Sequence, residues 1–112
     1  VQTCALPILC VALEVARAEQ GKQTLPRHYS NESNMIARIV LGGMTAKQWA
    51  QANGITGEPR DSMNAGQLEH LTYLESTNIT LIDLGMGYDQ RKAELVRLSQ
   101  RFLAKHLGAN HA

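Results

Sequence analysis

The chain has 112 residues and a formal net charge of +1, with 44% hydrophobic, 19% charged and 4% aromatic residues. This composition excludes a disordered tail, and the length limits the chain to one domain with an aliphatic core. The charge lies far below the basic excess that is typical of nucleic-acid-binding modules, which argues against strong non-specific DNA binding.

The first residues, VQTCALPI, resemble a translated sequencing adapter, so we predict that residues 1–8 are an artefact and exclude them from the fold. We expect the remaining chain to be the C-terminal part of a longer protein. We do not expect the apolar run that follows to be a signal peptide, because no basic segment precedes it in this sequence and Glu14 interrupts it. The two cysteines, Cys4 and Cys10, are too few to define a disulfide framework or a zinc site.

The predicted N-terminal unit covers residues 9–29. Apolar residues at helical spacing indicate a helix over residues 9–20, with Gly21 as its C-terminal cap. Pro26 disfavours a helical conformation at Leu25. We therefore expect residues 25–29 to be an extended connector.

A helical domain is predicted over residues 30–107, followed by a disordered tail over residues 108–112. Its first helix spans residues 30–41, with Ser30 as N-cap and Glu32 in the first turn. The apolar stripe of this helix consists of Met35, Ile36, Ile39 and Val40.

A second, short helix is expected over residues 45–53. Thr45 and Gln48 form a capping box at its start, and Gly54 ends it. Trp49 is expected to pack this helix against the rest of the domain rather than to stack on a base.

Residues 43–56 look like the first half of a helix-turn-helix. A recognition helix would have to begin about three residues after Gly54. Gly57 and Pro59 disfavour that helix, and the next clear N-cap is Asn64. The sequence therefore predicts a loop where the reading helix would lie.

Two long helices complete the prediction, over residues 64–84 and 88–107. Asn64 and Gln67 form a second capping box, and the short link around Gly85 favours an antiparallel hairpin. The candidate helix-pairing residues of the first long helix are Leu71, Leu74, Asn78 and Leu81. The predicted fold class is thus all-α, a small domain of about five helices centred on this hairpin.

The four candidate helix-pairing residues form a seam with heptad-like spacing. Asn78 is the one polar residue among them, and two interpretations of it remain open. Either it lies at the rim and bonds to solvent, or it fixes the register of helix pairing at a cost in stability. Under the second interpretation, Asn78→Leu should raise the melting temperature and loosen the oligomeric state.

No catalytic motif is present, so we expect neither enzymatic activity nor a cofactor. The four histidines lack metal-ligand spacing, and Glu69 and Glu75 do not share a helix face. The last helix carries a basic excess whose candidate phosphate contacts are Arg91, Lys92, Arg97 and Arg101. The same residues are also typical of a solvated face with pairs such as Arg91–Glu94.

Four motifs carry a resemblance to a known family: YSNExxMI, MTAKQ, an RD pair before a capping box, and LIxxGMxYxxRK. The chain from Arg27 to about Phe102 resembles the C-terminal helical region of phage-encoded regulators of the KilA-N and BRO antirepressor type. The resemblance implies a cytoplasmic phage or prophage protein concerned with transcriptional regulation, whose DNA-binding module lies upstream. The matching positions, as candidate interaction residues, are Tyr29, Asn31, Glu32, Lys47, Trp49, Arg60 and Asp61.

Taken together, these observations predict an accessory oligomerisation or effector module that acts through a protein partner or self-association, with no membrane contact. The alternative is direct DNA contact through residues 45–60 or the basic last helix.

Overall fold

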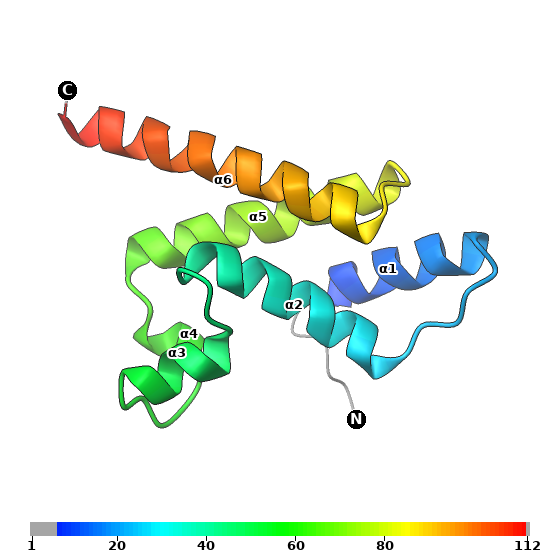
Figure 1. Ribbon diagram of the computed structural model, residues 1–112, viewed down its shortest axis with the longest axis horizontal. Coiled ribbons are helices and arrows are strands. Elements are labelled where there is room, and N and C mark those ends of the chain that lie inside the picture. The colour runs from blue at the N-terminus through cyan, green and yellow to red at the C-terminus, as the bar shows by residue number, and fades with distance from the viewer. Residues whose placement is uncertain (1–6, 112) are drawn as a thin grey trace.

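The computed structural model describes residues 7–111, and side chains are described for residues 8–106. The described part is all-helical and contains no strand, which confirms the predicted all-α class (Figure 1). It has six helices: α1 (Pro7–Glu19), α2 (Pro26–Val40), α3 (Ala46–Ala52), α4 (Pro59–Ser62), α5 (Ala65–Asp83) and α6 (Tyr88–His111).

Helix α5 lies at the centre and contacts α1, α2 and α6, while α3 and α4 pack together at one end (Figure 1). His70 of α5 contacts Ser99 of α6, and Asn78 of α5 contacts Arg91 of α6. The later residue of α5 thus meets the earlier residue of α6, so the two helices run antiparallel. The link between them contains Gly85, whose φ of 83° is accessible to glycine at little cost.

Both predicted capping boxes are confirmed. The Gln48 amide N–H donates to Thr45 Oγ1 at 3.2 Å, and the Thr45 amide N–H donates to Gln48 Oε1 at 3.0 Å. The corresponding distances for Asn64 and Gln67 are 2.8 and 3.0 Å. Each box satisfies two backbone donors that the first turn of a helix leaves free.

The start of the second helix was predicted wrongly. α2 begins at Pro26 rather than at Ser30, so that of the predicted connector 25–29 only Leu25 lies outside the helix, with an extended conformation of φ −108° and ψ 159°. Proline fits the first helical position, because the N–H that it lacks has no partner inside the helix. The restriction that proline imposes falls on the preceding residue, which here lies outside the helix.

Three further boundaries differ from the expected ones. α4 occupies part of the predicted loop, so the described residues contain six helices rather than five. Residues 7–8 belong to α1, and α6 extends through residues 108–111. The rest of the predicted artefact, residues 1–6, and the last residue lie outside the described part.

The core consists of two clusters of buried apolar side chains. The larger one lies between α2, α5 and α6 and comprises Met35, Ile36, Ala37, Leu41, Met63, Leu71, Leu74, Leu81 and Leu95. Trp49 packs against it from α3, as expected. The smaller cluster holds α1 on α5 and comprises Leu9, Cys10, Leu13 and Ile82. Cys10 is disulfide-bonded.

Candidate functional site

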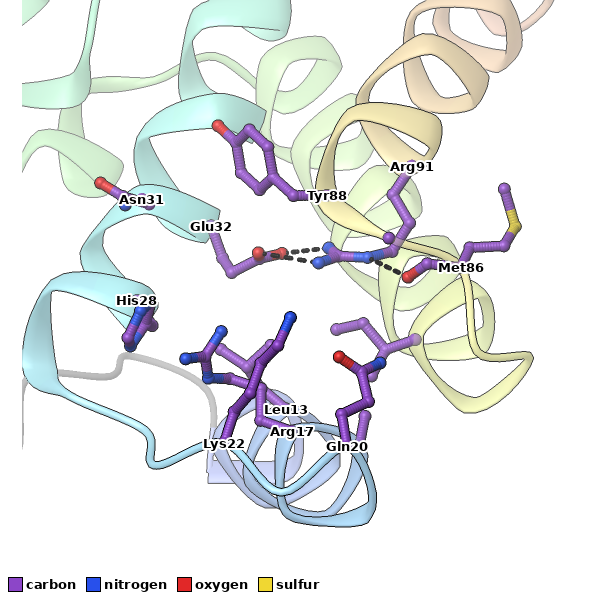
Figure 2. Close-up of a pocket in the computed structure, with 13 residues that line it drawn as sticks. Leu13, Arg17, Gln20, Lys22, His28, Asn31, Glu32, Met86, Tyr88 and Arg91 are labelled. Atoms are coloured by element: carbon purple, nitrogen blue, oxygen red, sulfur yellow. Dashed lines mark hydrogen bonds and ion pairs between the residues drawn. The ribbon is translucent and has the colours of Figure 1, made fainter.

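A buried polar cluster, formed by Glu32 of α2, Asn78 of α5 and Arg91 of α6, lies where the three helices meet. Glu32 is 3% exposed, Asn78 0% and Arg91 4%. The Arg91 guanidinium pairs with both carboxylate oxygens of Glu32, at 3.1 Å from Nη2 to Oε2 and still closer from Nη1 to Oε1 (Figure 2). This bidentate arrangement gives geometric specificity as well as energy.

Asn78 completes the cluster from the third helix. Its Nδ2 donates to Glu32 Oε1 at 2.9 Å, and its Oδ1 accepts from Arg91 Nη1 at 2.9 Å. Arg91 Nε also donates to the Met86 carbonyl at 3.0 Å, which ties the cluster to the link between α5 and α6 (Figure 2). Because buried charges are costly unless paired and hydrogen-bonded, this cluster specifies how the three helices pack.

The cluster excludes one of the two interpretations of Asn78. The residue is fully buried, so the interpretation as a solvated rim residue is wrong. Asn78 pins α5 to α2 and α6 of the same chain, and its hydrogen bonds are made within the molecule. Leu71, Leu74 and Leu81 are buried beside it, so the predicted seam faces the core.

Two other predicted roles need correction. Glu32 is not available as a surface interaction residue, because it is buried against Arg91. Arg91 does not reach solvent as a phosphate contact, since its guanidinium is bound by Glu32, Asn78 and Met86. The expected Arg91–Glu94 pair is also wrong, because Glu94 pairs with Arg97.

The remaining basic residues of α6 do not form one face. Lys92 lies at a groove between α2 and α6, whereas Arg101 lies on another side of α6, beside Tyr73 and Phe102. Arg97 is exposed but paired with Glu94. A concentrated phosphate-binding stripe along α6 is therefore absent from the described residues.

The other candidate interaction residues are spread over the molecule. Tyr29 donates a hydrogen bond of 2.5 Å to Glu14 of α1. Arg60 forms an ion pair with Glu75, which ties α4 to α5. Burial raises the pKa of Glu75, and the Arg60 charge acts against that rise. Asn31, Lys47 and Asp61 are exposed at separate places, and no single site gathers these residues.

The region that resembles a helix-turn-helix is not followed by a recognition helix in the described part of the chain. After Gly54 the chain runs through a loop into α4, which has four residues and packs against α3. A recognition helix needs two turns or more to place side chains in a major groove. Within the described residues α3 is therefore followed by no reading helix.

An apolar groove runs between α2 and α6 and encloses about 430 Å³. We call it the α2–α6 groove. Of its lining residues, Met35 and Ser99 are buried, while Val96 and Leu103 are 38% and 45% exposed. The remaining lining residues are Arg38, Ile39, Tyr88, Lys92 and Gln100.

Comparison with known proteins gives no match to a protein-family model, a curated protein or a solved structure. None of the helices in the described part is both long and apolar enough to cross a membrane. The described side chains also bring together no group of three or more His, Cys, Asp or Glu residues that could hold a metal ion.

Sequence reasoning missed a buried histidine between α5 and α6. His70 Nε2 lies 2.7 Å from Ser99 Oγ, and its ring stacks on Phe102 at a centroid distance of 5.0 Å. Burial lowers the pKa of His70, and the neighbouring His106 lowers it further. The folded protein thus holds His70 neutral at a pH where the unfolded chain binds a proton.

This difference predicts that stability falls on acidification. Above the unfolded pKa of about 6.5 both states are neutral, and below it protonation favours the unfolded chain. We expect the melting temperature to fall between about pH 7.5 and about pH 5.5, and to fall less in His70→Gln. Calorimetry at both pH values checks this, and an equal fall in both proteins would contradict it.

Proposed function

We propose that this chain is a protein-association module of a phage or prophage transcriptional regulator, and that its α2–α6 groove binds an acidic amphipathic helix of a partner protein. The regulatory context rests on the resemblance to KilA-N and BRO antirepressor-type proteins. The association role rests on the groove, which is the observation that carries the proposal.

The groove has the form that a helix-in-groove interaction requires. On α6, Lys92, Val96, Ser99 and Leu103 follow one another at steps of 4, 3 and 4 residues and so share one face. Exposed apolar side chains in a concave site lose contact with water when a partner helix inserts its own apolar face. Val96 and Leu103 are the anchors that such a helix would cover.

The charges that line the groove favour an acidic partner helix. Arg38 and Lys92 line the groove, and none of its described lining residues is Asp or Glu. Acidic residues beside the apolar face of a partner helix would meet these two cations and steer association. A two-fold contact with a second copy would instead bring like charges together, which disfavours self-pairing through this groove.

The test uses a labelled helical peptide with leucines at i, i+3, i+4 and i+7 flanked by glutamates, titrated by fluorescence anisotropy. We expect Val96→Glu to weaken binding about tenfold or more, because it places a carboxylate where the peptide is acidic and apolar. Val15→Glu is the matched control, because Val15 is 52% exposed on α1 outside the groove, and it should bind normally. A peptide with lysines in place of the glutamates should bind poorly.

Three results would contradict the proposal. In the first, the acidic peptide does not bind, and in the second, Val96→Glu and Val15→Glu weaken binding equally. In the third, sedimentation shows a self-association that Val96→Glu abolishes, which would assign the groove to a second copy. A different result would favour the DNA-contact alternative instead. In that case the chain binds duplex DNA, the affinity falls steeply between about 50 and about 200 mM salt, and Arg101→Gln abolishes binding.

A further inference from the structure

A second cavity, of about 500 Å³, lies between α1, the start of α2 and the start of α6 (Figure 2). We call it the α1–α2 cavity. It is distinct from the α2–α6 groove, because Tyr88 is the one described residue that lines both. Leu13 and Ala16 of α1, Ile82 of α5 and Met86 of the following link supply the apolar part.

The charged side chains that line the cavity have a net positive charge. Arg17, Lys22 and Arg91 bring three positive charges, and Glu32 brings the one negative charge among the lining residues, which leaves +2 when His28 is neutral. Glu32 is already bound by Arg91. Arg17 and Lys22 form no ion pair with any described carboxylate.

The two uncompensated cations are directed into the same space. Figure 2 shows the Lys22 amine end pointing toward the Glu32–Arg91 pair, with the Arg17 guanidinium beside it. Arg17 Nη2 donates to the Gln23 carbonyl at 2.9 Å, which holds the side chain in place. Arg17 Nε is buried and has no hydrogen-bond partner, so this cation is only partly satisfied by the protein.

His28 of α2 also lines this cavity and carries a further hydrogen-bond donor. Its Nδ1 accepts the Leu25 backbone N–H at 2.9 Å, so the neutral ring carries its proton on Nε2. Partial removal from solvent lowers the pKa of His28, and the charges of Arg17 and Arg27 lower it further. The ring is thereby kept neutral, with its Nε2–H free of the Leu25 contact.

We propose that the α1–α2 cavity binds a small phosphomonoester that carries an apolar body. A phosphomonoester has a charge of about −1.5 to −2 at pH 7 and three acceptor oxygens, which matches two unpaired cations and a neutral donor. The apolar body lies against Leu13, Ile82 and Met86. Sites of about 300–1,000 Å³ that combine an apolar lining with a few polar groups are typical of small-molecule binding.

Phenyl phosphate is the probe, measured by calorimetric titration of the whole chain. We expect phenol, which lacks the charge, and inorganic phosphate, which lacks the apolar body, to bind at least about tenfold more weakly. Lys22→Gln should weaken phenyl phosphate about tenfold, whereas Lys47→Gln, which removes an exposed charge on α3, should leave its affinity unchanged. Equal weakening by both variants, or no binding to the unmodified chain, would overturn the proposal.

Methyl NMR locates the ligand independently of affinity. The chain has four methionines, of which Met86 lines this cavity and Met35 lines the α2–α6 groove. We expect phenyl phosphate to shift the Met86 methyl resonance, assigned through Met86→Leu, and to leave that of Met35 in place. A shift of Met35 alone would place the ligand in the groove and overturn the assignment to this cavity.

Discussion

Replacing Arg91 with methionine is expected to lower the free energy of unfolding by about 3–5 kcal/mol. Methionine preserves most of the length of the side chain but leaves the Glu32 carboxylate buried without its cation, at 3% exposure. Asn78 alone cannot neutralise that charge. Urea unfolding, followed by circular dichroism and by the fluorescence of Trp49, measures the loss.

The neighbouring substitution Lys92→Met is the matched control, because Lys92 is exposed and forms no ion pair with a described residue. It should change stability by no more than about 0.5 kcal/mol. The double variant Glu32→Leu with Arg91→Met removes both charges and should recover much of the loss, which gives a positive coupling energy. If Arg91→Met were as stable as Lys92→Met, Glu32 and Arg91 would not form a buried pair.

The parts of the fold that sequence reasoning predicted are those that depend on neighbouring residues. The Asn64–Gln67 capping box closes within one helical turn, so the two residue types at that spacing are sufficient to place the start of α5. The Thr45–Gln48 box places α3 in the same way. The spacing of Leu71, Leu74 and Leu81 identified the face of α5 that is buried.

The buried polar cluster could not be predicted in this way, because Glu32 and Arg91 are 59 residues apart in the chain. Local spacing predicted an Arg91–Glu94 pair instead. Arg97 also lies three residues from Glu94, on its C-terminal side, and it forms the ion pair with that carboxylate. One signal was present. A lone Asn78 on an apolar seam needs buried partners for its amide, and this requirement points to polar residues on the helices packed against it.

The missed helix α4 and the early start of α2 share one cause. Both begin with a proline, Pro59 and Pro26, and both prolines occupy the first helical position. In a sequence, such a proline is equally consistent with a connector and with a helix start. For α4 the distinction depends on tertiary contacts, among them the ion pair between Arg60 and Glu75.

Replacing Asn78 with leucine is the second substitution for which a large effect is expected. The sequence alone and the structure predict stability changes of opposite sign for it. An asparagine that merely interrupts an apolar seam predicts that leucine raises the melting temperature. In the structure, leucine would remove the hydrogen bonds of 2.9 Å to both Glu32 and Arg91. We therefore expect Asn78→Leu to lower the free energy of unfolding by about 1–3 kcal/mol, because two buried charged groups each lose a partner.

The exposed residue Ser76 on the same helix gives the control, since Ser76→Leu adds a leucine to α5 without touching the cluster. It should stay within about 0.5 kcal/mol of the unmodified chain. Because the hydrogen bonds of Asn78 are made within the molecule, sedimentation should show the same oligomeric state before and after Asn78→Leu. A rise in melting temperature would mean that Asn78 contributes specificity at the expense of stability; a change in mass would mean that it also acts between chains. If stability falls while the mass is unchanged, Asn78 is the residue through which α5 holds the Glu32–Arg91 pair in register.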